Sequence, residues 1–358
     1  MRIAILAGGQ WHEPDLERGL QACGIETLLL NANMLVEERP VLGRVSDLLV
    51  RISNRIPPLL PLSRLFFYGA SRSLVRRFNP SVLIIWASFA LEYQKKEGWP
   101  VVLVRGSSHI QQQRAIFDSF PVGKDYKSEK GPNRRAIARE LSEYSAALLV
   151  TVPTKEISES PLWSSTNIEV NPYGFSPIEF SIDRKNHLIG SSIRLLFAGQ
   201  TSLRKGIDRL GEIAVQGKDL SLSVYGPLVQ PKSAFENANV VYKGDLSRAD
   251  LHYEYQKHDI FVLLSREEGM ARAGMEAVSA GMPIVVTRAT GLSIWCELGA
   301  GICLDDGYTQ QQFGEAINSI ASNITQFQNV CLEIARGWTW ENHAELLISQ
   351  IKDALERK

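Results

Sequence analysis

The chain has 358 residues and carries 39 basic and 39 acidic side chains, so its formal net charge is zero. This balance excludes a general electrostatic attraction to nucleic acid, and the length is typical of two domains of ordinary size. The hydrophobic content of 44% is sufficient for a packed core in each of them.

Cysteine usage and the N-terminus indicate a cytoplasmic protein. The four cysteines have no metal-ligand or paired spacing, which favours a reducing compartment; they are Cys23, Cys296, Cys303 and Cys331. The first residues enter an apolar strand pattern at once and lack a signal-peptide layout. The longest apolar run, residues 82–91, is too short to cross a bilayer as a helix.

Short apolar runs alternate with helical patterns along the chain, which predicts an α/β fold with parallel sheets. In the first half, the predicted strands lie near 2–6, 26–30, 82–86, 101–105 and 147–152. After a polar stretch, the second half gives predicted strands at 194–198, 220–225, 240–242, 260–264 and 284–287. Two such domains facing one another would form a cleft, and open parallel sheets bind ligands at the carboxyl ends of their strands.

Two loops of the first half carry candidate functional residues. Gly8 and Gly9 follow the first strand, where a glycine pair is weak evidence and an ordinary tight turn is the alternative. Arg105 and His109 lie at the end of the strand at 101–105. A lone histidine is more often structural than catalytic, but a loop position at the carboxyl end of a strand favours function.

A second feature of the first half is a basic segment. Residues 41–91 contain a single acid, Asp47, and seven arginines, which are Arg44, Arg51, Arg55, Arg64, Arg72, Arg76 and Arg77. Apolar residues at 45–56 follow helical spacing, and such a basic amphipathic helix can lie on an anionic membrane surface. A helix packed on the sheet with its arginines in water is an equal alternative. Residues 124–139 are also basic and polar, and this composition predicts a mobile loop.

The first strand of the second half ends at a possible anion site. The strand at 194–198 ends at Gly199, and two adjacent cations, Arg204 and Lys205, follow before a helical pattern. Arginine can bind a diphosphate with two parallel hydrogen bonds, and lysine acts as a point charge. The alternative is a solvated helix start with incidental charges.

Two glutamates lie in a strand-loop-helix-strand unit. Glu268 follows the apolar run 260–264, and Glu276 lies on the helix that precedes the run 284–287. A helix start at this edge of a sheet presents free N–H groups and suits a phosphate. Carboxylates only accept hydrogen bonds, so the pair suits hydroxyl donors of a sugar or ribose. The alternative is two solvated side chains.

The residues around these glutamates form a specific string. Glu268-Gly269-Met270-Ala271-Arg272, continued by Met-Glu-Ala-Val-Ser-Ala-Gly-Met-Pro-Ile-Val-Val-Thr at 275–287, resembles the donor-site signature of retaining glycosyltransferases of family four (glycosyl transferases group 1). Shorter strings elsewhere in the chain also match that family and occur in the same order as in the family, at 171–174, 225–227, 242–244, 287–291 and 338–342. This agreement covers roughly residues 145–358, whereas the first 140 residues match only in outline.

The resemblance implies the GT-B fold, with two Rossmann-like parallel-sheet domains that face a cleft. Residues 1–175 would then form an acceptor-binding domain, 176–338 a nucleotide-sugar donor-binding domain, and 339–358 a helix that returns to the first domain. The resemblance also implies a retaining, metal-independent transfer of a sugar from a nucleoside-diphosphate donor to an acceptor hydroxyl, with no other cofactor. The sequence has no Asp-x-Asp pair and no closely spaced histidines, which agrees with a site without metal.

The resemblance assigns the two cations to the donor diphosphate. Members of the family often have an arginine directly after the strand-ending glycine, but this chain has Gln200 there. Arg204 would therefore supply the second positive charge beside Lys205. Both would stabilise the charge that develops on the leaving diphosphate.

The remaining site residues follow from the same resemblance. Glu276 would hold the ribose and Glu268 the transferred sugar. Further donor contacts are implied at Gly8, Gly9, Gly199, Gly226, Tyr242, Lys243, Gly269, Met270, Ala271 and Arg272. Many relatives have a histidine beside the reacting sugar, so Arg105 and His109 are joint candidates for that catalytic position.

The expected activity belongs to the synthesis of bacterial surface polysaccharide, lipopolysaccharide or glycolipid, with a glycan or lipid-linked acceptor and no nucleic acid partner. Two alternatives stay open: a GT-B nucleotide-sugar epimerase, and a non-catalytic GT-B scaffold that binds a partner. The expected location is the cytoplasm, and residues 44–77 offer a peripheral position on the inner face of the membrane as a further alternative.

Overall fold

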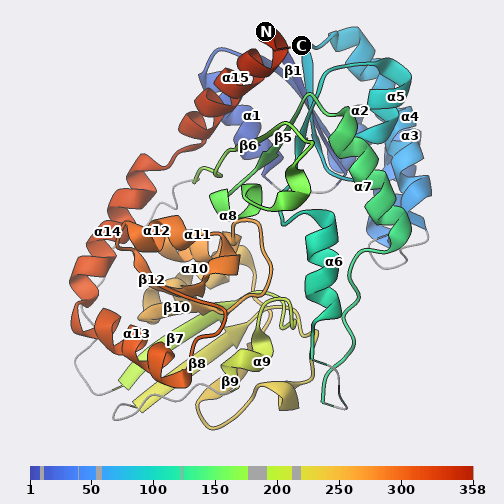
Figure 1. Cartoon of the computed structure of the whole chain (residues 1–358). Coiled ribbons are helices and arrows are strands. Elements are labelled where there is room, and N and C mark those ends of the chain that lie inside the picture. Colours follow the sequence, from blue (N-terminus) through green and yellow to red (C-terminus); the bar gives the residue numbers. More distant parts are fainter. Residues whose placement is uncertain are drawn as a thin grey trace. The chain divides into compact units, whose positions relative to one another are not determined.

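The computed structural model describes residues 1–8, 12–38, 40–53, 59–121, 123, 125–175, 192–211 and 219–357. They fold into two compact units, and Figure 1 labels most of their helices and strands. Unit 1 consists of Met1–Ile110, Pro132–Gly174 and Trp340–Lys358, and unit 2 consists of Gln111–Gly131 and Phe175–Thr339. A short excursion of the chain, Gln111–Gly131, thus belongs to unit 2 although both of its neighbours belong to unit 1.

Unit 1 is built on a six-stranded sheet in the order β2-β1-β3-β4-β5-β6, in which all pairs are parallel. The strands are β1 (Arg2–Ala7), β2 (Glu26–Asn31), β3 (Val82–Trp86), β4 (Val101–Val104), β5 (Leu149–Val152) and β6 (Ile168–Val170). The helices are α1 (Glu13–Ala22), α2 (Ala32–Glu38), α3 (Pro40–Ser53), α4 (Leu60–Phe78), α5 (Leu91–Glu97), α7 (Arg134–Ala146), α8 (Lys155–Ser158) and α15 (Trp340–Glu356), with a 3-10 turn at Pro161–Trp163.

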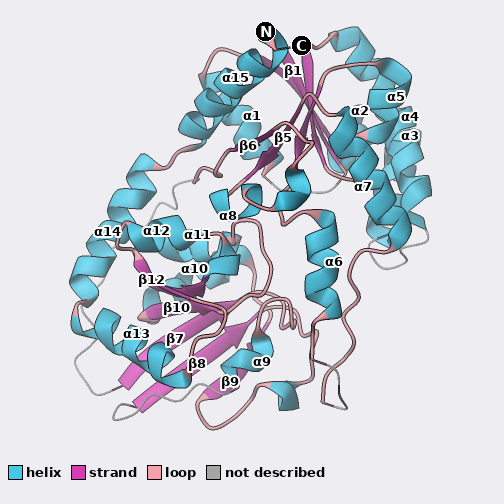
Figure 2. Ribbon diagram, in the orientation of Figure 1, coloured by secondary structure: helices cyan, strands magenta, loops and turns pink. Residues whose placement is uncertain are grey.

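Unit 2 contains a second parallel six-stranded sheet, in the order β12-β11-β10-β7-β8-β9. Figure 2 shows the strands in magenta. The strands are β7 (Ser192–Ala198), β8 (Asp219–Tyr225), β9 (Val240–Gly244), β10 (Ile260–Leu263), β11 (Ile284–Thr287) and β12 (Gly301–Leu304). The helices are α9 (Ile207–Leu210), α10 (Arg248–Lys257), α11 (Arg272–Ser279), α12 (Ser293–Glu297), α13 (Gln310–Ser322) and α14 (Ile324–Gly337), with 3-10 turns at Lys232–Ala234 and Arg288–Thr290. Helix α6 (Ile110–Asp118) begins where the chain enters this unit.

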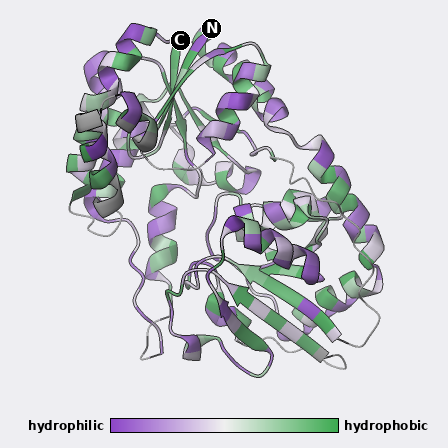
Figure 3. Ribbon diagram, turned by 180° about the vertical axis from the view of Figure 1, so that it is seen from behind, coloured by the Kyte–Doolittle hydropathy of each residue, from purple (hydrophilic) through white to green (hydrophobic). Residues whose placement is uncertain are grey.

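The strands form because they are continuous apolar runs, which suit parallel sheets covered on both faces. Residues 3–7 of β1 and 260–263 of β10 are completely buried. Figure 3 shows the strands mainly in green, whereas the helices alternate between green and purple. The helices are therefore amphipathic and pack on the sheets with their apolar stripes.

The α/β fold with two parallel sheets is confirmed, and each of the ten predicted strands coincides with an observed one. Each sheet has one further strand that was not predicted, β6 in unit 1 and β12 in unit 2. Residues 124–139 differ from the predicted loop, because Arg134 begins α7. Asn133 caps this helix, since its Oδ1 accepts a hydrogen bond from the Ala136 N–H at 2.9 Å.

The C-terminal helix α15 packs on α1 within unit 1. The two helices approach closely at Gly19, where a Cβ atom would lie 2.4 Å from the carbonyl oxygen of Trp340. Asn171, which follows β6, donates its Nδ2 to the carbonyl oxygen of His343 at 3.3 Å and to Oε1 of Gln350 at 3.2 Å. The last segment of the chain thus completes unit 1, on which the chain began.

Each sheet has a point at which the strand order changes direction. In unit 1 the chain adds β2 on one side of β1 and then β3 on the other, so the change falls between β1 and β3. In unit 2 the chain adds β8 and β9 and then returns to place β10 on the other side of β7. Open parallel sheets bind ligands outside the carboxyl ends of the strands at such points.

Candidate functional site

Two loops meet at the switch point of unit 2. Residues 199–206 follow β7 and residues 264–271 follow β10, and the two strands pair directly. Gly206 has a positive φ of 71°, and a Cβ atom there would lie 1.9 Å from the carbonyl oxygen of Leu264. Only glycine permits this conformation and this close approach of the two loop backbones.

A partly buried ion cluster joins these loops. Nη1 of Arg204 lies 3.0 Å from Oε1 of Glu268, and Nζ of Lys205 lies 2.6 Å from the same oxygen. Arg204 also donates Nη1 to the carbonyl oxygen of Glu267 at 2.9 Å. Burial opposes the charge of Glu268, but Lys205 and Arg204 outweigh this effect, so the pKa of Glu268 lies below its usual value. The carboxylate is therefore ionised at neutral pH.

The turn that carries both cations is held by its own backbone and by the neighbouring loop. The carbonyl oxygen of Ser202 accepts hydrogen bonds from the N–H groups of Lys205 and Ile207 at 3.1 and 3.2 Å. Arg266 donates Nη1 to the carbonyl oxygen of Leu203 at 2.7 Å and forms a two-point ion pair with Asp208 at 2.7 and 2.6 Å. The predicted pair Arg204 and Lys205 is thus fixed toward Glu268.

Glu276 belongs to a separate charge group on α11. Its Oε1 lies 3.0 Å from Nε of Arg248 and 3.2 Å from Nε of Arg272. The hydroxyl group of Tyr255 donates to its other oxygen at 3.4 Å. The two arginine side chains are about half exposed, at 52% and 44%. Arg248 was not predicted, because no local motif in the sequence marks it.

The start of α11 is less open than predicted. No side chain caps the helix at Ala271, and both Met270 and Ala271 are buried. The Ala271 N–H already donates to the carbonyl oxygen of Thr290 at 2.9 Å. An anion at this helix start would therefore meet N–H groups from Arg272 onward rather than that of Ala271.

Three of the predicted donor residues meet at the ends of β7, β8 and β9. Gly226 has φ of 127°, and a Cβ atom there would lie 2.1 Å from the carbonyl oxygen of Gly199. The Tyr242 hydroxyl group donates to the carbonyl oxygen of Gly226 at 2.9 Å. Lys243 is exposed beside them, and Nζ of Lys232 lies 5.0 Å from the centre of the Tyr242 ring.

The candidates that the structure describes in unit 1 are packed against their own neighbours in that unit. Gly8 follows β1 and packs against Phe89, whose ring would lie 2.2 Å from a Cβ atom at Gly8, while Gly9 lies outside the described residues. Arg105 is buried and pairs its Nη1 with Oε2 of Glu140 at 3.1 Å. Its Nε donates to the carbonyl oxygen of Ser108 at 3.0 Å. Arg105 is thus held inside unit 1 by its own neighbours.

His109 is almost fully buried, with 1% exposed, between two aromatic rings. The ring centres of Tyr144 and Trp163 lie 5.2 and 4.6 Å from that of His109. Burial, with a smaller effect of Arg105, lowers the pKa of His109 to about 4. The imidazole is therefore neutral at pH 7 and enclosed by aromatic rings, and its catalytic role stays a prediction.

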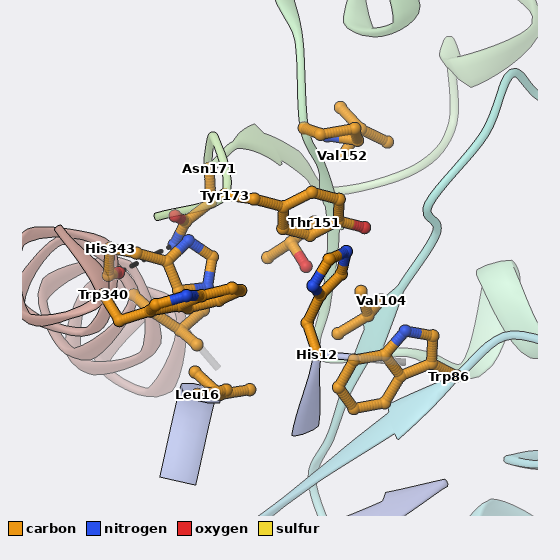
Figure 4. A pocket seen from close by; sticks show the side chains of 12 residues that line it. His12, Leu16, Trp86, Val104, Thr151, Val152, Asn171, Tyr173, Trp340 and His343 are labelled. Carbon is orange, nitrogen blue, oxygen red and sulfur yellow. Dashed lines mark hydrogen bonds between the residues drawn. The ribbon is translucent and has the colours of Figure 1, made fainter. Parts of the chain in front are cut away.

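Unit 1 also contains a small pocket at the carboxyl ends of β3, β4 and β5, which the sequence analysis missed (Figure 4). The His12 ring lies 4.8 Å from that of Tyr173 and 5.5 Å from that of Trp340. Oδ1 of Asn171, in the pocket wall, is buried without a hydrogen-bond partner. The cavity of about 10 Å³ is about the size of one water molecule, which could bond to this oxygen.

Within the described ranges, no group of three His, Cys, Asp or Glu side chains is arranged to hold a metal ion. Over the same part of the chain, no helix has both the length and the apolar character needed to cross a bilayer.

The chain shares sequence features with known proteins. Its residues 179–338 match the model of the family Glycosyl transferases group 1. It is 24% identical to the O-antigen biosynthesis glycosyltransferase WbnH of Escherichia coli over 155 residues. These residues make up 42% of this chain and 44% of WbnH. The match therefore spans less than half the length of that curated relative.

Two solved structures share the fold. Sucrose-phosphate synthase from Thermosynechococcus elongatus superposes with a TM-score of 0.71 at 13% identity over 100% of both chains. HepE of Anabaena, solved in complex with UDP, gives a TM-score of 0.57 at 14% identity over 99% of this chain and 100% of that one. At such identities the likeness concerns the fold alone, and the predicted GT-B fold is confirmed.

The fold and the motifs at the switch point of unit 2 define a domain of the glycosyltransferase class. Residues 179–338, which make up most of this unit, belong to the glycosyl transferases group 1. The predicted resemblance to the glycosyl transferases group 1 is therefore confirmed for this part of the chain, whereas the retaining mechanism stays a prediction.

The ion cluster predicts a pH-dependent effect of Lys205→Met. A glutamate with a lowered pKa stabilises the fold above the pKa of the unfolded residue, and this contribution is lost as the pH falls through the folded pKa. Without Lys205, Glu268 keeps only one of its two cations, so the variant should lose about 1.5–3 kcal/mol at pH 7. The loss should shrink as the pH falls through the lowered folded pKa of Glu268, where its carboxyl group becomes protonated.

Thermal unfolding of both proteins between pH 7 and pH 4 measures this difference. Lys257→Met is the matched control, because Lys257 pairs with Glu254 at 2.7 Å but its side chain is 64% exposed. Such exposed pairs contribute little to stability. A loss for Lys205→Met that is equal at every pH, or no larger than that of the control, would contradict the assignment.

Proposed function

We propose that the chain is a retaining glycosyltransferase that moves a sugar from a nucleoside-diphosphate donor to an acceptor hydroxyl. The observation that carries the proposal is the convergence of Arg204 and Lys205 on Glu268 at the switch point of unit 2. This cluster lies inside the segment that matches the glycosyl transferases group 1. The similarity to WbnH supports a role in bacterial surface glycan synthesis, and the fold shared with a UDP complex makes UDP the first nucleotide to test.

The proposed chemistry uses the two cations to stabilise the leaving diphosphate. As the bond between the anomeric carbon and the diphosphate oxygen breaks, negative charge develops on that oxygen, and preorganised positive groups lower the energy of this state. The acceptor oxygen forms the new bond to the anomeric carbon on the same face. Its proton passes to the departing phosphate oxygen, so the enzyme supplies no nucleophile.

The glutamates serve as acceptors of hydrogen bonds from hydroxyl groups. Glu268 lies beside both cations, so it is close to the place where the transferred sugar leaves the diphosphate. Glu276, on α11 with Arg248 and Arg272, would hold the ribose. Unit 1 would bind the acceptor, a glycan or a lipid-linked molecule.

The proposal predicts that the wild-type chain binds a nucleoside diphosphate and that Glu276→Gln weakens this binding. A hydrogen bond to a charged group contributes about 1.5–3 kcal/mol, so we expect an increase in Kd of about 10- to 100-fold. Isothermal titration with UDP, GDP, ADP and their sugars gives Kd, and the melting temperature monitors the fold. Glu333→Gln, on the exposed surface of α14, should leave Kd unchanged.

Equal affinity of Glu276→Gln and wild type would contradict the ribose role, and the lack of binding to every nucleotide would contradict the whole proposal. A nucleotide-sugar epimerase would convert its donor without any acceptor, so product analysis in the absence of acceptor separates the two activities. A scaffold would bind partners but turn over no donor.

We expect the transfer to need no divalent metal, because Arg204 and Lys205 can balance the charge of the diphosphate. Turnover should be unchanged, within about twofold, after dialysis against a strong chelator. An acceptor-dependent assay with and without added magnesium or manganese measures this. Activity that disappears with the chelator and returns with a metal ion would overturn the metal-free mechanism.

Peripheral membrane binding through residues 44–77 is part of the proposal, and the structure limits which residues can contribute. Arg64 is buried, and Arg76 forms a two-point ion pair with Glu97 at 2.9 Å. Arg55 lies outside the described residues. Exposed on α3 and α4 are the basic residues Arg44, Arg72 and Arg77 and the apolar residues Leu48, Leu62 and Leu65.

Replacing Arg44, Arg72 and Arg77 with glutamine should weaken binding to anionic vesicles, since each basic residue near such a surface contributes about 1 kcal/mol. Cosedimentation with anionic and neutral vesicles at low and high salt measures the effect. The control replaces three exposed cations elsewhere in unit 1, Arg134, Arg135 and Lys155, with glutamine. Equal and negligible binding of the wild type to both vesicle types would contradict the proposed membrane binding.

A further inference from the structure

Residues 125–131, here called the strap, belong to the excursion of the chain that folds with unit 2. The strap docks through Lys127 onto the side chain of Gln230. The Lys127 N–H donates to Oε1 of Gln230 at 2.7 Å, and Nε2 of Gln230 donates to the Lys127 carbonyl oxygen at 2.8 Å. Gln230 is completely buried, so both ends of a buried amide are used to hold this backbone.

Gln230 is itself tied to the loop after β7. Its N–H donates to the carbonyl oxygen of Thr201 at 2.9 Å, and the N–H of Val229 donates to Oγ1 of Thr201 at 2.8 Å. Thr201 is completely buried and lies three residues before Arg204. The strap is therefore attached to the same backbone that presents the two cations.

The strap positions the carboxylate of Glu129 against the turn that carries Arg204 and Lys205. Oε1 of Glu129 accepts from the N–H of Leu203 at 2.6 Å, and Oε2 accepts from the N–H of Arg204 at 3.4 Å. Nε2 of Gln230 donates to Oε1 of Glu129 at 2.7 Å. Three donors from two different loops thus converge on one side chain.

These two N–H groups need an outside partner. The turn at 202–207 starts at Ser202, whose carbonyl and hydroxyl oxygens accept only from residues further along, including Lys205 at 3.1 and 3.3 Å. The first N–H groups of a helical turn have no carbonyl partner within the turn. Glu129 satisfies them in place of a local capping side chain.

We propose that Glu129 is a positioning residue: the strap carboxylate caps the Leu203–Arg204 backbone and thereby keeps Arg204 and Lys205 directed at the donor diphosphate. The effect on donor binding rests on the proposed function, whereas the capping itself does not. The opposite role, a carboxylate that excludes an anionic donor, would give a donor effect of opposite sign.

Glu129→Ala in the full chain tests the proposal by two measurements. The first is amide hydrogen exchange in peptides that cover residues 202–207, which should become about tenfold faster, because a lost cap opens the first turn. The second is the Kd for the nucleotide that the wild type binds, which should rise about tenfold. In a transfer assay, the KM for the donor should rise while the KM for the acceptor stays constant.

Two further variants sharpen the comparison. Asp125→Ala removes another acid of the strap, which is exposed, and should behave as wild type in both measurements. Glu129→Gln keeps the size and one acceptor oxygen but not the charge, so its exchange and Kd should lie between wild type and Glu129→Ala. An unchanged melting temperature in all three would separate positioning from a general loss of fold.

Unchanged amide hydrogen exchange at 202–207 in Glu129→Ala would overturn the proposal, because the turn would then be stable without the carboxylate. Tighter donor binding in this variant would also overturn it, in favour of a carboxylate that excludes the donor. If the wild type binds no nucleotide, the proposed function fails, and the exchange comparison still decides whether Glu129 caps the turn.

Discussion

The structure of unit 2 depends on one buried carboxylate that is shared by two cations. Glu268 has a side chain that is 10% exposed and lies within 3.0 Å of both Arg204 and Lys205. A charge in such a place is strongly unfavourable unless it is paired. The loops after β7 and β10 must therefore stay close together, and the contacts of Gly206 and Arg266 between these loops hold them there.

The fold was largely predictable because strands in parallel sheets are continuous apolar runs. The two missed strands lie at sheet edges, where this signal is weak. The residues of β6 are all only partly buried. β12 begins with Gly301, and glycine usually indicates a break in a strand. Here it is needed because a Cβ atom would lie 2.0 Å from the carbonyl oxygen of Ile284, a constraint that only the paired strand reveals.

The site was predictable only where it is local in sequence. Arg204, Lys205 and Glu268 each follow a strand end, and adjacent strands bring them together. Glu129 and Arg248 carry no such mark, because their partners are set by tertiary contacts; Glu129 is 74 residues from Leu203. His109 had a suggestive loop position, but its burial between aromatic rings depends on α7 and the turn at Pro161–Trp163, which single-sequence patterns did not place.

The strap shows how a family domain can depend on a segment outside it. The family match covers 179–338, and this range contains both cations and both glutamates. Glu129 lies outside it, in a segment whose two ends continue into unit 1. The capping of the Arg204 turn is therefore supplied by the part of the chain that matches the family only in outline. A fragment that begins after residue 175 would keep every residue of the signature but would lack the carboxylate that satisfies the first two N–H groups of the turn.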